Sequence, residues 1–276
     1  ELCGAVVTWM DPTSEDNCAI EEFSSSHPNG GVFDVGTTTV TYTALDIHGN
    51  SLTASFDIVI ADNEAPTISS LSGDLSSAND LGSCGAFMFW SEPRGDDNCN
   101  LLSLTSTHQS GSFFDVGTTT VTYTATDIYG NEFAQSFDIT ITDSENPSLA
   151  GDLGDMTVST DLDQCDAVVM WSEPEAVDNC PGATYSSDIA NGSALALGST
   201  LVTYTVVDAA GNSFETSFTV TVEDNQSPVF DSAPQDITLN SDSGQCSAAH
   251  SWAAPQTSDN CPNLNLNTSH PSGSAF

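Results

Sequence analysis

Acidic side chains return at a fixed spacing in this sequence and offer the oxygen ligands that a hard cation requires. Two acidic columns have a period of 81 residues: Asp46, Asp127 and Asp208, which open D-x-x-G-N segments, and Asp62, Asp143 and Asp224. Carboxylate, amide and carbonyl oxygens in loops are the usual ligands of Ca²⁺ in proteins. Asp and Asn are also common turn residues, so the columns alone fit either a metal site or a set of turns.

The charge balance favours the metal over the turns. Thirty-nine acidic residues face a single basic residue, Arg94, and the formal net charge is −38. Such a charge repels itself, and divalent cations would neutralise part of it, so we predict structural Ca²⁺ as the cofactor. Nucleic acid is excluded as a partner because binding phosphates requires cationic side chains. The sequence contains no apolar run long enough to cross a bilayer, which predicts no membrane insertion in this segment.

The 81-residue period predicts a chain of small domains, because a unit of this length can bury a core of its own. Acidic, proline-terminated segments such as "ADNEAP" mark the linkers. We expect four repeats at 1–61, 62–142, 143–223 and 224–276, the first incomplete at its N-terminus and the last at its C-terminus. We therefore predict that the sequence is one part of a longer array of repeats. The neighbouring repeats of that array are its first predicted partners.

Within a repeat, alternation of apolar and polar residues predicts half-buried β-strands and no helix. The clearest alternating apolar sets are Val121, Tyr123 and Ala125 in one segment and Phe137, Ile139 and Ile141 in the next. Shorter strands are expected in 3–9, 155–160 and 167–171, for a total of about six or seven per repeat. This density predicts an all-β fold of tandem immunoglobulin-like sandwiches, with "DIYGN" as a tight turn between the last two strands.

In such a sandwich, the turn between the last two strands lies at the end where the chain enters the domain. The Asp of each linker should therefore meet the D-x-x-G-N Asp of the next repeat, and we predict calcium sites on Asp62 with Asp127 and on Asp143 with Asp208. The further predicted ligands are Glu64, Glu145 and Asp224, together with Asp97 and Asp178 if their D-N-C loops lie at the same end. Gln226 replaces the linker glutamate in the third linker and weakens that site.

Other residue types with chemical potential repeat in columns as well. His27, His108 and His270 share a column that carries Ile189 in the third repeat, which excludes a catalytic or zinc role that every repeat would need, and no catalytic residue is predicted. Trp9, Trp90, Trp171 and Trp252 are expected in the cores. The cysteines form two columns: Cys3, Cys84, Cys165 and Cys246, and Cys18, Cys99, Cys180 and Cys261. Without metal-binding spacing, paired columns predict disulfides in an oxidising, extracellular or cell-surface setting.

The segments "GSCGAFMFWSEPRGDDNC" and "FFDVGTTTVTYTATDIYGN" carry a resemblance to the HYR (hyalin repeat) module, and the resemblance extends over the whole chain. The family implies immunoglobulin-like β-sandwiches in tandem, as in hyalin-like matrix proteins and large bacterial surface and gliding adhesins, and it implies no enzymatic activity. Many members have two further cysteines, at positions where this sequence has Ser69 and Ser70, and Gln135 and Ser136. Their joint loss implies that they pair with each other, which leaves Cys84 for Cys99 and Cys165 for Cys180. Free thiols and bonds between repeats are the alternatives.

These features predict an extracellular adhesive or structural filament segment stiffened by calcium. Its further partners would be other filaments, cell-surface glycans or matrix. The alternative is a lectin-like module that holds a carbohydrate through calcium at one loop end, which requires a free site that no neighbouring repeat shares.

Overall fold

The computed structural model of the protein describes residues 2–262 and 264–276. The chain separates into two compact units, 1–143 and 144–276, and each unit contains two of the sequence repeats. The described residues form β-strands and no helix, as predicted. None of the described segments is a helix long and apolar enough to cross a membrane.

The first unit begins with a repeat of five strands and continues with a repeat of eight. The strands of the first repeat are β1 (Gly4–Val6), β2 (Ile20–Ser25), β3 (Val32–Asp34), β4 (Gly36–Asp46) and β5 (Ser51–Ile60). Those of the second repeat are β6 (Thr67–Ser69), β7 (Leu75–Ala78), β8 (Gly85–Phe87), β9 (Arg94–Asp96), β10 (Leu101–Ser106), β11 (Phe113–Asp115), β12 (Gly117–Asp127) and β13 (Glu132–Thr142).

The second unit repeats this pattern and ends in a segment with two short strands. The third repeat has β14 (Ser148–Ala150), β15 (Met156–Ser159), β16 (Asp166–Val168), β17 (Glu175–Val177), β18 (Thr184–Ser187), β19 (Ala194–Ala196), β20 (Gly198–Val207) and β21 (Ser213–Glu223). The last repeat has β22 (Val229–Ser232) and β23 (Gln256–Ser258).

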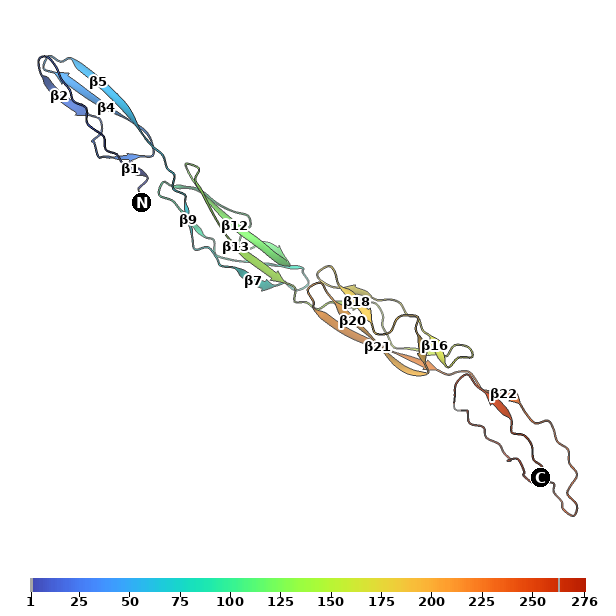
Figure 1. Cartoon of the computed structure of the whole chain (residues 1–276). Helices are drawn as coiled ribbons and strands as arrows, with labels where there is room; N and C mark the ends of the chain where they lie inside the picture. Colours follow the sequence, from blue (N-terminus) through green and yellow to red (C-terminus); the bar gives the residue numbers. More distant parts are fainter. Residues whose placement is uncertain (1, 263) are drawn as a thin grey trace. The chain divides into compact units, whose positions relative to one another are not determined.

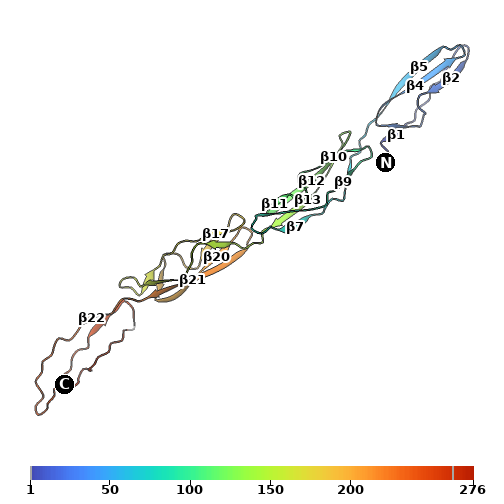
Figure 2. The same ribbon diagram turned by 180° about the vertical axis from the view of Figure 1, so that it is seen from behind.

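Each eight-stranded repeat is a two-layer sandwich. In the second repeat, one layer is the four-stranded sheet β10-β12-β13-β7, in which β7 runs parallel to β13 (Figures 1 and 2). The opposite layer consists of two antiparallel ribbons, β8 with β11 and β6 with β9. The third repeat has the same pairings, with the sheet β18-β20-β21-β15. This arrangement confirms the predicted all-β, immunoglobulin-like architecture.

The hairpin of β12 and β13 supplies most of the core of the second repeat. Val121 pairs with Phe137 across the hairpin, and both side chains face the ribbons. Val121, Tyr123, Phe137, Ile139 and Ile141 are all buried, whereas the threonines between them lie on the outer face. The alternation in the sequence therefore predicted correctly which face of the hairpin is buried.

The tryptophan column lies at the edge of each core, as expected. Trp90 is half-buried and packs edge-on against Phe137, with ring centroids 5.5 Å apart. Its indole N–H donates to the Tyr123 hydroxyl at 2.8 Å, and that hydroxyl donates to the Glu92 carboxylate. Burial raises the pKa of Tyr123, and the hydrogen bond to the Glu92 carboxylate raises it further. Trp171 makes the same hydrogen bond in the third repeat. The indole N–H therefore finds its partner in the tyrosine hydroxyl at the edge of the core.

The two complete repeats contain eight strands each, which is more than the six or seven expected. The strands that the sequence analysis did not locate are β6, β9, β10 and β11 in the second repeat and their counterparts β14, β17, β18 and β19 in the third. β9 has the sequence "RGD", without an apolar residue, and pairs only through its backbone with β6. β10 contains a bulge between Leu101 and Ser103 that breaks the alternation on which the prediction depended.

The buried hairpin face predicts where a truncation will destabilise the second repeat. Ile139 is 0 % exposed, so Ile139→Ala should lower the free energy of unfolding by about 2 to 5 kcal/mol, through lost burial and the cavity left behind. Leu81, at 92 % exposed in the same repeat, is the matched control, and Leu81→Ala should change stability by less than about 0.5 kcal/mol. Equal shifts of the denaturation midpoint in the two variants would contradict this assignment of the core.

Candidate metal centre between the first two repeats

Three carboxylates from separate parts of the chain meet where the first repeat passes into the second. Asp62 lies in the linker after β5, Asp97 in the D-N-C loop after β9, and Asp127 at the end of β12. One oxygen from each lies within 4.8 Å of the other two. The structure thus brings together Asp62 and Asp127, the pair expected from the sequence, and adds Asp97 to them.

Asp127 is held rigidly by the turn that it opens. Its side chain is 0 % exposed. Its Oδ1 accepts the backbone N–H groups of Tyr129 and Asn131, both at 2.8 Å, and its Oδ2 accepts the Asn131 amide at 2.7 Å. The same amide also donates to the backbone carbonyl of Asp62 at 3.3 Å, which ties the turn to the linker. Burial acts to raise the pKa of Asp127, but these hydrogen bonds outweigh it, and the net pKa lies below its ordinary value.

Several oxygens around this cluster are buried without a donor. Asp62 Oδ2, Asp97 Oδ2 and Asn98 Oδ1 have no hydrogen-bond partner among the described residues. The other carboxylate oxygens do have one: Asp62 Oδ1 accepts the Glu64 N–H at 3.1 Å, and Asp97 Oδ1 accepts the Cys99 N–H at 2.7 Å. Buried acceptors of this kind are costly unless something pairs with them.

The cluster has no lysine or second arginine available to it. Arg94 is the one arginine of a sequence without lysine, and it lies exposed on β9. Three carboxylates converge here, and Asp62 and Asp97 each have one oxygen without a donor among the described residues. This arrangement matches the oxygen ligands that Ca²⁺ takes. The residues at this junction therefore fit a calcium ion.

Glu64 lies beside this cluster rather than in it. Its side chain is exposed and, with Asp96, Asp97 and Asn98, lines an open hollow of about 430 Å³. The three-carboxylate group does not include it. A ligand role for Glu64 remains a prediction.

The second unit contains the same local turn. Asp208 is 7 % exposed, and its Oδ1 accepts the N–H groups of Gly211 at 2.6 Å and Asn212 at 2.8 Å. Burial acts against ionisation, but the hydrogen bonds from Asn212 and Gly211 bring the pKa of Asp208 below its ordinary value. Asp178 Oδ2 accepts the Cys180 N–H at 3.0 Å, and its Oδ1 is buried without a donor among the described residues. Glu145 is half-buried in this unit, and Asp143, the last residue of the first unit, is buried.

The third linker differs because Gln226 uses its amide on the preceding repeat. Its Nε2 donates to Asp163 Oδ1 at 3.0 Å, and its Oε1 accepts the Asp163 N–H at 3.1 Å. Asp224 accepts the Gln226 N–H at 3.0 Å through Oδ1. An amide that pairs with an aspartate in both directions stands where the other linkers have a glutamate, and the weaker site expected there remains a prediction.

The disulfide pairing differs from the expected one. Cys99 is bonded to Cys3, not to Cys84, with a Cα–Cα distance of 4.6 Å. Cys165 is bonded to Cys261, not to Cys180, with a Cα–Cα distance of 4.8 Å. Both bonds join the first-column cysteine of one repeat to the second-column cysteine of the next repeat, 96 residues later. Bonds between repeats, one of the alternatives, are what the structure contains.

The two cysteine columns cannot pair within a repeat because they lie at its opposite ends. Cys84 follows β7, whose last residue, Ala78, pairs with Thr142 where β13 leaves the repeat. Cys99 instead lies two residues from Asp97, beside the incoming linker. The segment between the cysteines does not fold back along β8, because β8 pairs with β11 and the next strand, β9, pairs with β6.

The remaining cysteines fall into two groups. Cys84 and Cys180 are also disulfide-bonded. Cys18 and Cys246 are exposed free thiols in this structure, which therefore bonds six of the eight cysteines predicted to form disulfides.

Two asparagines that the sequence analysis did not single out lie beside the cluster. Asn131 joins the Asp127 carboxylate to the Asp62 carbonyl, and Asn98, next to Asp97 in the chain, has a buried amide oxygen. Both belong to the repeated motifs D-N-C and D-x-x-G-N, so their recurrence with the aspartates was the available signal.

The histidine column has a packing role. The His108 ring lies against Phe114, with centroids 5.2 Å apart, and His27 lies against Phe33 at 5.6 Å. Both rings cover the edge of a core, which is consistent with the Ile189 found at this position in the third repeat.

Comparison with known proteins identifies the family. The family model described as "HYR domain" matches residues 1–60, 61–141 and 143–222. The chain belongs to the HYR family. It is 33 % identical over 277 residues to hyalin from Strongylocentrotus purpuratus and 33 % identical over 263 residues to hyalin from Lytechinus variegatus, covering 95 % and 92 % of this chain. It spans 23 % and 50 % of the lengths of these relatives.

Among solved structures, the HYR chain is similar to the protocadherin gammaB7 EC3-6 cis-dimer structure, with a TM-score of 0.34 and 16 % identity over 86 % of this chain and 74 % of that one. Disulfides persist in oxidising compartments. Together with membership of the HYR family, the disulfides place the chain outside the cell.

Peptide mapping tests the pairing directly. With one arginine and no lysine, the chain should be digested without reduction by a protease that cleaves at acidic residues. Cross-linked peptides should join Cys3 to Cys99 and Cys165 to Cys261. Cys3→Ser should expose a new thiol at Cys99, whereas Cys18→Ser, which changes an exposed free thiol, should leave both bonds intact. Recovery of a Cys84–Cys99 peptide would contradict the structure.

Proposed function

We propose that this segment is part of an extracellular adhesive or structural filament in which Ca²⁺ stiffens the joints between HYR repeats. The observation that supports the proposal most strongly is the group formed by Asp62, Asp97 and Asp127, with its buried oxygens that lack donors. The proposed role is mechanical, and it assigns no residue to catalysis.

The position of the group explains how a bound ion would act on the joint. Asp62 belongs to the linker, whereas Asp97 and Asp127 belong to the body of the second repeat. A cation held by all three would fix the linker to that body. The Cys3–Cys99 bond crosses the same joint, and the Cys99 N–H donates to Asp97. Metal and disulfide would therefore restrain one short stretch of chain from two sides.

The sequence period extends the proposal to further residues. By the 81-residue spacing, Asp143, Asp178 and Asp208 are the equivalents of Asp62, Asp97 and Asp127, and we propose them as a second ligand set on that basis alone. Glu64 and Glu145 are proposed as outer ligands. Asp224 is proposed as a weaker ligand, because Gln226 is engaged by Asp163.

The environment of the group favours a structural ion over a lectin-like site. A sugar-binding calcium must keep coordination positions open to solvent, yet Asp127 is 0 % exposed. The three carboxylates also come from both the linker and the repeat, so the site is not a free one within a single repeat. Neighbouring repeats are the proposed partners in the array. Other filaments, glycans or matrix are proposed partners of the assembled array.

Scattering and melting of the whole chain test the calcium proposal. In millimolar Ca²⁺ the chain should show a longer maximum dimension and a higher melting temperature than in chelator, because an ion that binds the native joint stabilises it. Asp127→Asn should remove a large part of both differences. Asp115→Asn, which neutralises an exposed aspartate of the same repeat, is the matched control and should behave as the wild type.

Sodium at matched ionic strength separates ligation from screening. Salt weakens repulsion between carboxylates but cannot bridge a linker to a domain. If chelation leaves both readouts unaltered, or if sodium reproduces the effect of Ca²⁺, the acidic residues form a solvated surface and the proposal fails.

A further inference from the structure

The Cys3–Cys99 bond and the three-carboxylate group meet in one short loop of the second repeat. Cys99 is 1 % exposed, and its N–H donates to Asp97 Oδ1 at 2.7 Å. Asn98 lies between them in the chain, and its amide donates to the Cys99 sulfur at 3.6 Å. The backbone that carries the disulfide therefore also sets where the Asp97 carboxylate lies.

The three carboxylates differ in what positions them. Asp127 is fixed by its own turn, whose backbone and side-chain N–H groups donate three hydrogen bonds to it. Asp97 accepts the Cys99 N–H through one oxygen, and Asp62 accepts the Glu64 N–H through one oxygen. The other oxygen of each has no donor among the described residues. Their alignment with Asp127 therefore depends on how the linker and the D-N-C loop are held.

The disulfide closes a loop of chain around this joint. It links Cys3 in the first repeat to Cys99 in the second, 96 residues later, and the linker that carries Asp62 lies between them in the sequence. Opening the bond would leave the two repeats connected covalently through the linker alone. The bond therefore keeps Asp62 at a high effective concentration beside Asp97 and Asp127.

We propose that the Cys3–Cys99 disulfide is a positioning element of the calcium site, so that the affinity for Ca²⁺ depends on the redox state of this bond. The inference rests on the proposed calcium function and concerns the regulation of the same site. An ion and a disulfide that close the same joint favour each other, because the first closure removes conformational freedom that the second would otherwise have to remove. By reciprocity, bound Ca²⁺ stabilises the bond against reduction by the same factor by which the bond raises the affinity.

The inter-repeat bond of the second unit provides a comparison within the same chain. Around the Cys165–Cys261 bond, the Asn260 amide donates to the Gln164 carbonyl at 2.7 Å and to the Thr160 hydroxyl at 3.2 Å. Among the described residues, no group of three converging metal-ligating side chains includes a residue of this loop. The Cys165–Cys261 bond is therefore the same kind of cross-link without the same neighbouring ligands, and its redox equilibrium should depend little on Ca²⁺.

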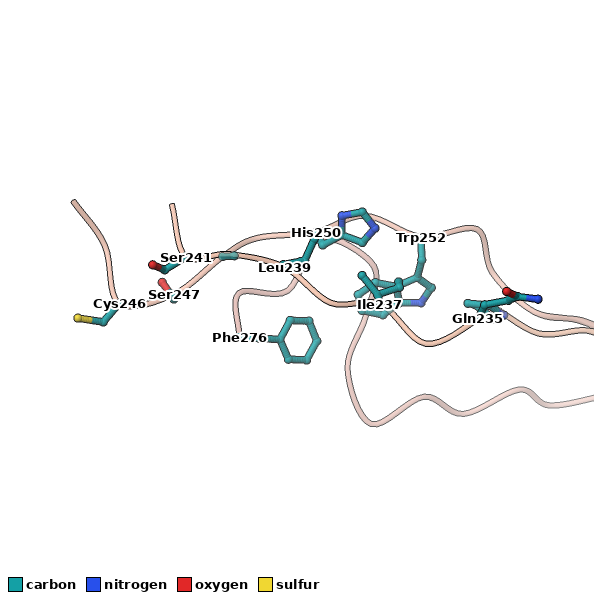
Figure 3. Close-up of a pocket in the computed structure, with 11 residues that line it drawn as sticks. Gln235, Ile237, Leu239, Ser241, Cys246, Ser247, His250, Trp252 and Phe276 are labelled. Atoms are coloured by element: carbon teal, nitrogen blue, oxygen red, sulfur yellow. The ribbon is translucent and has the colours of Figure 1, made fainter. Parts of the chain in front are cut away.

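Two exposed thiols must be removed before the bonds are titrated. Cys18 and Cys246 are free, and a free thiol can attack a disulfide and exchange with it. Cys246 lies beside Ser241 at one end of an apolar pocket of about 560 Å³, and its sulfur points away from Trp252 and Phe276 (Figure 3). Cys18→Ser and Cys246→Ser together should therefore prevent exchange without disturbing this pocket, and the double variant is the parent chain of the experiment.

Redox titration of the parent chain with dithiothreitol measures the effect of Ca²⁺ on the bond. The reagent passes two electrons to a disulfide, which opens to two protein thiols, while its own two thiols give up their protons to the protein sulfurs and close to a cyclic disulfide. Differential alkylation and peptide mapping report each bond by itself. In saturating Ca²⁺, half-reduction of Cys3–Cys99 should require a ratio of reduced to oxidised dithiothreitol about tenfold higher than in chelator at matched ionic strength. The ratio for Cys165–Cys261 should be the same in both.

Calorimetric titration with Ca²⁺ measures the effect of the bond on the affinity. Cys3→Ser, made in the parent chain, should raise the Kd of the site that Asp127→Asn removes by the same factor of about ten, without changing the stoichiometry. Cys165→Ser breaks the other inter-repeat bond and is the matched control, with an unchanged Kd. If Cys3→Ser does not fold, the redox titration of the parent chain decides by itself.

The possible outcomes distinguish failure of the coupling from failure of the calcium function. If Ca²⁺ binds the parent chain but leaves the redox ratio of Cys3–Cys99 unchanged, or binds Cys3→Ser with the same Kd, the coupling is overturned and the calcium function stands. If the parent chain binds no Ca²⁺, both are overturned. Tighter binding by Cys3→Ser would also contradict the coupling, since it would show that the bond holds the carboxylates away from their binding geometry.

Discussion

Negative charge without an internal counter-ion is the constraint on which the rest of this structure depends. The chain has one arginine and no lysine for thirty-nine acidic residues, and Arg94 lies exposed on β9. The turn at Asp127 lowers the local cost by directing two backbone N–H groups and an amide at one carboxylate. Asp62 Oδ2 and Asp97 Oδ2 receive no such donor among the described residues, and the proposed cation would offset the cost of burying them.

The disulfides reinforce the joints, and this follows from the geometry of the sandwich. β7 and the Cys84 loop lie where β13 leaves the repeat, whereas the Cys99 loop lies beside the incoming linker. A cysteine at each end of a repeat can only bond to its neighbours along the chain. The observed bonds therefore connect domains, and core packing is left to stabilise each domain by itself. A filament made in this way would resist separation of its domains without requiring a large interface between them.

The sequence predicted what depends on local periodicity. Alternation in β12 and β13 identified Val121, Ile139 and their neighbours as buried. The 81-residue period shared by the linker aspartates and the D-x-x-G-N aspartates predicted that Asp62 and Asp127 lie at one junction, where the structure places them. Prediction from the sequence failed for features that depend on how distant segments are placed in the fold. The pairing of Cys84 with Cys99 followed from the family resemblance, because two further cysteines of the family are absent here, but Cys84 and Cys99 lie at opposite ends of a domain. Asp97 was a conditional ligand for the same reason, because the sequence did not show at which end of the repeat its loop lies, and the structure places that loop in the cluster. β9 escaped prediction because three residues without an apolar side chain carry no periodic signal.

The most direct test of the account is the calcium stoichiometry of the intact chain, measured by isothermal titration calorimetry after chelator treatment and at physiological ionic strength. The account predicts a saturable isotherm whose stoichiometry falls by a whole site in Asp127→Asn and is unchanged in Asp115→Asn. A featureless titration, or one in which both variants bind as the wild type does, would contradict the claim that the buried carboxylates at the joint hold a cation.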